Sequence, residues 1–298
     1  MDDRIFPEQA IIKTASGTFH LKLSKFINPD TKTLEHYVVN LGTYNRKCVQ
    51  INVPITKTTG ILIWVEGKGA KECSLESFVE KGLAKHMVLL GCTIARDINP
   101  HLTRLNLEDC SKFDCEVQDL KTIPVSMKAF HIAFHGATWY EYNFGATLQF
   151  DHEVYVDLKK NLHSNAHKPS RFDFMNDELA TILAPLYNQT ATWAEFFQVI
   201  EKTYGNKKCT KVYPWIQKAM GLVFEYREMF ENRYWTITFT DNAQTPLIPF
   251  LAYRDKQVGG RRSTRKKRRS EQLIPEERPL SFRNIPEIAT WTYTSEKN

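Results

Sequence analysis

The sequence has few of the features that direct a protein to a membrane or a secretory route. It contains no run of about 18 uninterrupted apolar residues, so we expect no transmembrane helix. Its first residues, MDDRIFPEQAII, begin with acids and lack the apolar segment of a secretory signal. We therefore expect an intracellular protein that makes no membrane contact.

Motifs of covalent catalysis are also missing. There is no G-x-S-x-G elbow for a nucleophilic serine, and no cysteine stands in a catalytic motif. The carboxylate pairs Glu108–Asp109 and Glu276–Glu277 are adjacent in sequence, so in a strand their side chains would point to opposite faces. These absences favour a binding protein over an enzyme.

Cysteine is scarce and scattered. There is no C-x-x-C pair, and the two closest cysteines, Cys110 and Cys115, have no second pair that would complete a zinc site. In a chain of 298 residues, such cysteines are typical of reduced, mostly buried thiols in an intracellular protein. The sequence therefore predicts reduced thiols at all six positions, Cys48, Cys73, Cys92, Cys110, Cys115 and Cys209.

Positive charge is concentrated in one segment. The chain carries a formal net charge of +6, and residues 261–269, RRSTRKKRR, hold seven cations and no acid. Without these seven charges the net charge would be +6 less 7, or −1, so the body is nearly neutral. No aromatic residue interrupts the run, so it predicts no base stacking. Seven cations can displace counterions from several phosphates, which predicts binding to nucleic acid or another polyanion through Arg261, Arg262, Arg265, Lys266, Lys267, Arg268 and Arg269.

The basic run has two other interpretations. The same composition is typical of nuclear-import signals, and it also suits a solvated loop of mutually repelling charges. The surrounding residues 254–298 contain three prolines and little periodicity, so we expect this C-terminal segment to be mobile. Its last large apolar residues, Ile288, Trp291 and Tyr293, could anchor the tail to the body or to a protein partner.

The first half of the chain has the pattern of an α/β domain. The run GILIWV at residues 60–65 is apolar throughout, which predicts a strand inside the sheet with both faces buried. Apolar residues keep helical spacing over residues 74–98, which predicts a long helix. We expect a mixed sheet and this helix in a domain of residues 15–160, with strands at residues 19–27, 36–41, 48–53, 60–65 and 102–107.

The second half is predicted to be mostly helical. Residues 159–171 are polar and suit a linker. Beyond them, the T-x-x-E capping box of Thr192 and Glu195 predicts the start of a helix, and further apolar residues keep helical spacing. We expect a smaller helical domain over residues 172–250, which includes a short alternating run at residues 234–239.

Residues 124–148, PVSMKAFHIAFHGATWYEYNFGATL, predict two helices separated by a glycine break at Gly136. Thr138 and Glu141 form a capping box for the second helix. That helix carries three large aromatic residues within about a turn and a half, so it must pack against another element. The simplest interpretation is a corner of the hydrophobic core.

His131 and His135 stand four residues apart and therefore share one face of the first of these helices. Two such imidazoles can bind a metal, as in H-E-x-x-H, but here no acid lies between them. His152 and Glu153 are the candidates for a third ligand. Because a metal site needs a defined third and fourth partner, we favour structural histidines and predict no metal.

Gly67, Lys68 and Gly69 follow the apolar run and precede the predicted long helix. A glycine loop that leads into a helix N-terminus can present N–H groups to a phosphate. The loop lacks the G-K-[ST] of a Walker motif and the G-x-G-x-x-G of a dinucleotide site. A simple strand-to-helix turn is the alternative interpretation.

The order of strands, glycine loop, long helix, strand and aromatic helix resembles that of the GCN5-related N-acetyltransferases. Their loop, [RQ]-x-x-G-x-[GA], wraps the pyrophosphate of acetyl-CoA. Trp64, Gly67 and Gly69 stand at the matching positions, so the glycines fit whereas Trp64 replaces the family's Arg or Gln. A tyrosine of the family's last helix often protonates the leaving thiolate, and Tyr140 would stand there, although the family's Gly-Phe is Phe-Gly here. The resemblance implies acetyl-CoA bound by Gly67, Lys68 and Gly69, with Tyr140 as the catalytic residue.

The block TWYEYNFGA, residues 138–146, is similar to a block in uncharacterised proteins of large eukaryotic DNA viruses. The segments LNLED, residues 105–109, and Thr192–Trp193 accompany it in the same order. This resemblance implies a viral origin, and with it a place in the host cytoplasm, the virion or the nucleus. It implies no particular activity.

The sequence supports three functional hypotheses. The first is a non-enzymatic binding or structural protein that contacts nucleic acid or another polyanion through residues 261–269. The second is an acyl-CoA-dependent N-acyltransferase that uses Gly67, Gly69 and Tyr140. The third is a protein-interaction subunit whose basic run is only a nuclear-targeting signal.

Overall fold

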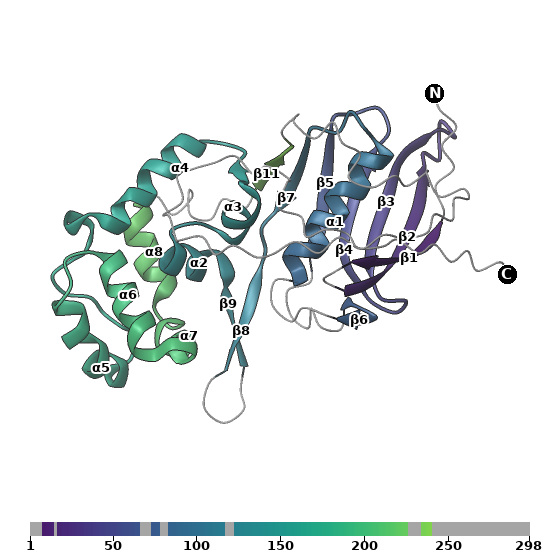
Figure 1. Cartoon of the computed structure of the whole chain (residues 1–298). Coiled ribbons are helices and arrows are strands. Elements are labelled where there is room, and N and C mark those ends of the chain that lie inside the picture. The colour runs from purple at the N-terminus through teal and green to yellow at the C-terminus, as the bar shows by residue number, and fades with distance from the viewer. Residues whose placement is uncertain are drawn as a thin grey trace, which may run out of the picture.

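The computed structural model describes residues 8–14, 17–65, 73–77, 83–116, 122–225 and 234–239. Within them the chain has the predicted α/β fold, in which a mixed sheet and one long helix are accompanied by a mostly helical part (Figure 1). The predicted C-terminal segment, residues 254–298, lies outside the described residues.

The sheet begins with consecutive antiparallel strands: β1 (Gln9–Thr14), β2 (Gly17–Ile27), β3 (Leu34–Gly42), β4 (Lys47–Pro54) and β5 (Thr59–Val65). The last four were predicted from the sequence, β5 from its continuous apolar run. β7 (Arg104–Glu108) then pairs with β5 in parallel, and β11 (Tyr234–Thr238) and β10 (Thr147–Leu148) complete the order β1-β2-β3-β4-β5-β7-β11-β10. A two-residue strand, β6 (Glu76–Ser77), pairs separately with the start of β2.

The long helix α1 (Leu83–Ile98) packs on one face of the sheet, over β3 and β4. The contact is close at Gly91, where an added Cβ would come within 2.8 Å of Ile51 Cδ1. Val49 and Leu41 surround the same point. The helix can approach the sheet this closely because residue 91 has no side chain.

The helix begins later than the sequence predicts. We expected helical structure from residue 74, but Ser74 and Leu75 hydrogen-bond to the backbone of Thr18, and residues 76–77 form β6. Pairing with β2 therefore replaces helix in this segment. The apolar spacing continues through the strand, so periodicity alone could not locate the start of the helix.

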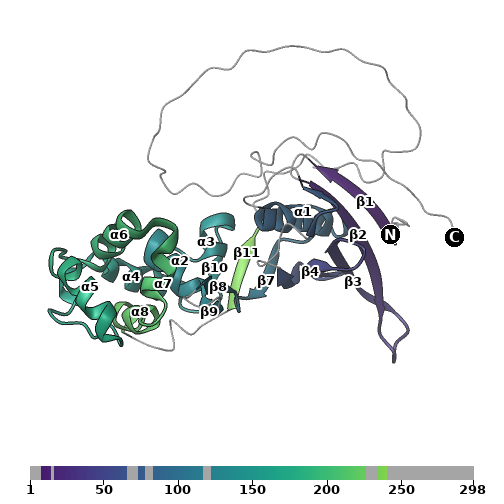
Figure 2. The same cartoon turned by 90° about the horizontal axis from the view of Figure 1, so that it is seen from below.

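β5 lies inside the sheet, between β4 and β7, as its apolar sequence predicts. The prediction that both of its faces are buried is wrong. Leu62 is 3% exposed, whereas Ile61, Ile63 and Trp64 are 51%, 47% and 54% exposed. The reason is that α1 lies on one side of the sheet, over β3 and β4, and no described helix lies on the other side (Figure 2).

The hairpin of β8 (Lys112–Glu116) and β9 (Thr122–Ser126) precedes the predicted pair of helices. The sequence predicts the first of them from residue 124, but residues 122–126 pair with β8, so α2 (Met127–His135) begins only after its N-cap Ser126. It ends at the predicted glycine break, Gly136, whose φ of 70° is left-handed. The second, α3 (Trp139–Phe144), starts with the predicted capping box of Thr138 and Glu141. Both helix boundaries therefore follow from local capping chemistry.

The helical part surrounds a group of large aromatic side chains. Trp193 and Trp215 are fully buried at its centre, with ring centroids 6.4 Å apart. The predicted capping box of Thr192 and Glu195 starts α6.

No described helix is long and apolar enough to cross a membrane. The helices are α4 (His152–Lys159), α5 (Asp177–Asn188), α6 (Trp193–Tyr204), α7 (Lys208–Val212) and α8 (Ile216–Phe224), with short 3₁₀ turns η3 (Lys160–His163), η4 (Asn165–His167) and η5 (Gly205–Lys207).

The sheet and the helical part are not divided where the sequence suggested. β11, which lies within the predicted helical domain, pairs with β7 and β10 in the main sheet. The helical part is therefore an insertion between two neighbouring strands. The predicted linker is also built into the fold: Leu162 is buried, and Lys168 Nζ donates hydrogen bonds to the carbonyls of Tyr187 and Thr190. Buried side chains of both parts form one continuous core.

Four of the six cysteines form disulfides, so the prediction of reduced thiols is wrong for these four. Cys48 of β4 is bonded to Cys73, and Cys115 of β8 is bonded to Cys209 of α7. The partners are 25 and 94 residues apart, and no spacing motif in the sequence indicates them. The cysteines therefore no longer support a reducing compartment.

Candidate functional site

The parallel strands β5 and β7 separate at their carboxyl ends. Their ladder joins Thr59–Leu62 to Arg104–Leu107 and extends no further along the described strands. β5 continues to Val65, which stays paired with β4. In this pairing Ile63 is an extra residue of β5, so the strand has a bulge. A bulge bends a strand and increases its twist, which explains why residues 63–65 leave β7.

The predicted glycine loop starts at this end of β5. Gly67, Lys68 and Gly69 lie outside the described residues, so phosphate binding there stays a prediction. The residues on either side are described: Val65 pairs with β4, and Cys73 is joined to β4 by its disulfide. Both ends of the loop segment are therefore fixed on the same strand. Ligands of open α/β sheets bind outside the carboxyl ends of the strands, beside such crossover connections.

Tyr140 of α3 lies at the carboxyl end of β7. The carboxylate of Asp109, the residue that follows this strand, acts electrostatically on the Tyr140 hydroxyl. The side chain is 6% exposed and packs against Trp139 and Phe144. Burial raises the pKa of the Tyr140 hydroxyl, and Asp109 and Cys110 raise it further, so the phenol keeps its proton at neutral pH. The predicted catalytic tyrosine therefore lies at the sheet edge from which the glycine loop departs.

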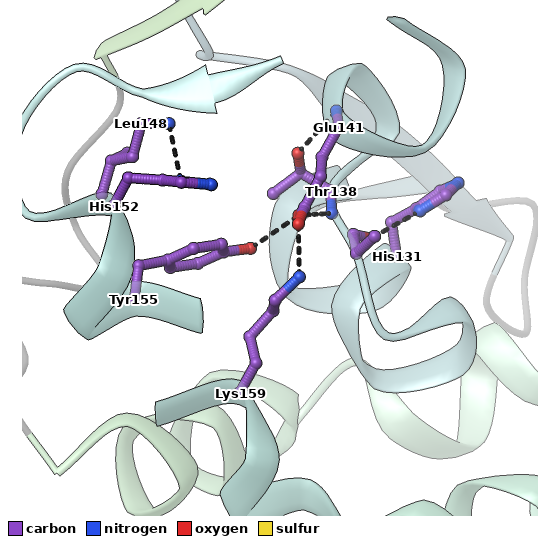
Figure 3. Close-up of polar contacts among 8 residues, drawn as sticks. His131, Thr138, Glu141, Leu148, His152, Tyr155 and Lys159 are labelled. Carbon is purple, nitrogen blue, oxygen red and sulfur yellow. Dashed lines mark hydrogen bonds and ion pairs between the residues drawn. The ribbon is translucent and has the colours of Figure 1, made fainter. Parts of the chain in front are cut away.

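The residue after Tyr140 is the centre of a buried polar network (Figure 3). Glu141 Oε2 accepts hydrogen bonds from the Thr138 N–H (3.1 Å) and the Tyr155 hydroxyl (3.0 Å). Its Oε1 forms an ion pair with Lys159 Nζ, and the two charged side chains are only 17% and 15% exposed. Tyr155 and Lys159 stand one turn apart on α4, so the network joins the start of α3 to the helical part.

The Tyr155 phenol is held in its neutral form. Burial raises the pKa of Tyr155, and the Glu141 carboxylate raises it further. The Lys159 ammonium also lies 5.0 Å from the centroid of the Tyr155 ring. The hydroxyl therefore donates to Glu141 throughout the neutral pH range, and the network fixes α3 and with it Tyr140.

Two histidines beside the network have defined neutral tautomers. His131 Nδ1 donates to the carbonyl of Ala137 (2.8 Å), which leaves its Nε2 as an acceptor. His152 Nδ1 accepts from the N–H of Leu148 (3.1 Å), so its proton is on Nε2. Burial lowers the pKa of both imidazoles, which favours these neutral forms.

His131 and His135 lie side by side on α2, as their spacing predicts, with ring centroids 4.4 Å apart. Tyr142 lies beside both rings, at 5.6 and 6.0 Å. Among the described residues there is no group of three or more His, Cys, Asp or Glu side chains that could hold a metal ion. The third ligands that the sequence suggested, His152 and Glu153, therefore do not complete a metal site.

The sequence pointed to Tyr140 but not to the side chains that hold its helix. Glu141 was predicted only as a cap, and Tyr155 and Lys159 were not singled out. Their spacing of four residues was a usable signal, because it places both on one helix face. The predicted polyanion-binding residues 261–269 lie outside the described residues.

Comparison of the chain with protein-family models, with curated proteins and with solved structures found no match. The resemblances to N-acetyltransferases and to viral proteins therefore stay predictions. A function for this chain has to rest on its strand arrangement and on the residues at the carboxyl edge of the sheet.

Proposed function

We propose that the protein is an acyl-CoA-dependent N-acyltransferase whose acyl-CoA substrate binds at the carboxyl ends of β5 and β7. The observation that carries the proposal is the separation of this parallel pair beside Tyr140. A ligand at this edge would meet three features. They are the backbone of β5 where it has no partner in β7, the glycine loop, and the buried phenol of Tyr140. The order β5, glycine loop, α1, β7 and aromatic helix is also the order on which the resemblance to GCN5-related N-acetyltransferases is based.

The edge of β5 at residues 63–65 suits an extended ligand that carries amide groups. Backbone groups that have left a ladder favour a ligand that takes the place of a strand. The pantetheine arm of CoA is such a chain, with two amides. Its pyrophosphate would then lie on Gly67, Lys68 and Gly69. Trp64 supplies neither the cation nor the amide of the family motif, so phosphate binding would depend on Lys68 and on the N–H groups of the loop.

The residues at this edge suit transfer of an acyl group to an amine. Bound acyl-CoA supplies an activated acyl thioester. Tyr140 would donate a hydrogen bond to its sulfur, where negative charge develops. An ordinary thiol has a pKa of about 8.5, below that of this buried phenol, so Tyr140 would donate the hydrogen bond and keep its proton. Glu108 is exposed at the end of β7 and would attract a cationic amine. The amine would lose a proton to solvent and attack the carbonyl carbon of the thioester. As the C–N bond forms, the C–S bond breaks, and CoA leaves as a thiolate that is stabilised by the Tyr140 hydroxyl and takes its proton from solvent.

Binding of acetyl-CoA to the full chain, measured by titration calorimetry and thermal shift, tests the first step. Gly69→Glu would place a carboxylate among the phosphates, and we expect it to weaken binding at least about tenfold. Gly221→Glu is the matched control, because an added Cβ at this position of α8 meets open space. Absence of binding to the wild-type chain, or equal binding by Gly69→Glu, would overturn the proposal.

Turnover with a panel of lysine peptides and polyamines tests the role of Tyr140. Tyr140→Phe keeps the ring and removes the donor, so we expect turnover to fall about 100-fold while acetyl-CoA affinity stays unchanged. Tyr142→Phe is the control, because that side chain is 66% exposed two residues away. Equal turnover by the two variants would remove Tyr140 from the mechanism.

A polyanion-binding protein is the second candidate function. It is favoured by the segregation of charge, since residues 261–269 hold seven cations and the remainder of the chain has a net charge of −1. Nucleic acid is the expected partner for such a run. A nuclear-targeting role in a protein-interaction subunit is the alternative use of the same residues.

A further inference from the structure

One face of the sheet is free of the described helices. α1 packs over β3 and β4. On the same face, Tyr155 of α4 packs against Trp235 of β11, with ring centroids 5.3 Å apart. Figure 2 shows α1 on one side of β2, β3 and β4 and no described helix on the other. We call this other surface the open face.

The strand register identifies the side chains of the open face, because directly paired residues share a face. Lys22 pairs with Asn40, Asn40 with Gln50, and Gln50 with Trp64. This row of four side chains crosses β2 to β5. Phe26 lies four residues beyond Lys22 on β2 and therefore belongs to the same face.

Aromatic rings are exposed at separated points of the open face. Trp64 is 54% exposed and Phe26 is 44% exposed. Phe26 is supported by His36 of β3, with stacked rings whose centroids are 4.5 Å apart. Three strand spacings of about 4.8 Å and four residues of about 3.4 Å put Trp64 about 20 Å from Phe26. Tyr234 of β11 adds a third exposed ring, 51% exposed, beyond β7.

Amide oxygens without partners lie between these rings. Asn40 is only 6% exposed, and Asn52 pairs with Ile61 one row further along. Within the described part of the chain, Asn40 Oδ1 and Asn52 Oδ1 are buried and accept no hydrogen bond. A buried acceptor without a donor costs about 1–3 kcal/mol, so a ligand that donates N–H groups here removes this penalty once the amide side chain turns outward to meet it.

We propose that the open face binds single-stranded nucleic acid, with bases stacked on Trp64 and Phe26. The exocyclic amines of bases donate hydrogen bonds, which the side-chain oxygen of an asparagine can accept. Lys22 and Arg104 are exposed cations of this face, placed for phosphates. In a duplex the faces of the bases are stacked on one another, so they cannot stack on the rings of Trp64 and Phe26. Ile61, 51% exposed, lies on the same face through its pairing with Asn52, so a second copy of the chain is the competing occupant that the test must exclude.

This site differs from residues 261–269 in its physical signature. A basic run binds phosphate charge, so its removal reduces the dependence of affinity on salt. Removal of a stacking ring weakens binding at every salt concentration and leaves that dependence unchanged. The site can be tested apart from the proposed acyl transfer, because Phe26 lies far from β5 and Phe26→Ala should leave acetyl-CoA affinity unchanged.

The test is binding of the full chain to short fluorescent single-stranded DNA and RNA, and to a duplex of the same sequence, at several salt concentrations. We expect Trp64→Ala and Phe26→Ala each to weaken single-strand binding about 5- to 100-fold with an unchanged salt slope. Trp64→Phe should recover most of the affinity, because it restores a stacking ring. Phe150→Ala, which removes a 63% exposed ring outside the sheet, should bind as the wild type does.

Three results would overturn the proposal. The first is wild-type affinity in both alanine variants. The second is an equal loss of duplex and single-strand binding, which would indicate a general electrostatic effect. The third is a dimer that dissociates in these variants, because the open face would then be an interface between two copies of the chain.

Discussion

Glu141→Ala is expected to be among the most destabilising single changes at the candidate site. The substitution removes the acceptor for the Tyr155 hydroxyl and for the Thr138 N–H, and it leaves Lys159 without its counter-ion. A buried ion pair that loses one partner costs about 3–5 kcal/mol, because the remaining charge stays desolvated. Lys159 is 15% exposed, so part of this penalty can be relieved by water. We expect a loss of about 3–4 kcal/mol.

The chain contains its own control for this experiment. Glu195 caps α6 through the same T-x-x-E box and accepts from the N–H groups of Thr192 (3.2 Å) and Ala191 (2.7 Å). It is exposed and makes no ion pair in the described structure. Glu195→Ala should therefore cost only the capping contribution, about 0.5–2 kcal/mol. The difference between the two variants measures burial and the ion pair, since the capping geometry is shared.

Denaturant unfolding of both variants and of Glu141→Gln/Lys159→Met gives the comparison. The double variant has no charge to leave unpaired, so it should recover most of the stability that Glu141→Ala loses. In thermal unfolding of a chain of this size, the same loss of about 3 kcal/mol lowers the melting temperature by about 6–12 °C. Equal losses in Glu141→Ala and Glu195→Ala, or no recovery in the double variant, would refute the reasoning.

Three further predictions concern packing, the disulfides and the basic run. Gly91→Ala should destabilise the chain by about 0–2 kcal/mol, because its Cβ would meet the fully buried Ile51 while alanine gains about 1 kcal/mol of helix propensity, whereas Gly221→Ala gains the propensity without a clash and should be neutral or stabilising; thermal unfolding compares them. Cys48→Ser opens a loop of 25 residues closed by Cys73, so under non-reducing conditions it should cost about 3 kcal/mol, and a reductant should remove the difference from the wild type. Deletion of residues 258–270 should abolish the steep part of the salt dependence of DNA and RNA binding; an unchanged slope would assign the basic run to targeting instead.

Local chemistry explains what could be predicted from the sequence. The capping boxes at Thr138 and Thr192 and the left-handed Gly136 set their helix boundaries through contacts within four residues. Strand β2 followed from alternation, which a strand needs in order to bury one face, and β3 and β4 followed from their β-rich composition. In every such case the sequence signal and the structural cause lie in the same short segment.

Long-range pairing explains what could not be predicted. Residues 234–239 alternate like a strand, but nothing local shows that they pair with β7, more than 120 residues earlier in the chain. The apolar run of β5 looks the same whether one or both faces are covered, and the coverage depends on where α1 packs. The ion pair of Glu141 and Lys159 likewise exists only because α3 and α4 meet, so the sequence predicts only a helix cap at Glu141, whereas the structure has the centre of a polar network there.

The two proposed ligands would meet at the bulge of β5, and this has a measurable consequence. The backbone of residues 63–65 faces the separated edge beside β7, while Trp64 belongs to the open face through its pairing with Gln50. A base stacked on Trp64 would therefore restrain the strand whose edge holds the pantetheine arm. Coupling of this kind is reciprocal, so acetyl-CoA must change oligonucleotide affinity by the factor by which the oligonucleotide changes acetyl-CoA affinity. Trp64→Ala should reduce that factor to one; a coupling that survives the substitution would show that the two ligands communicate through a different strand.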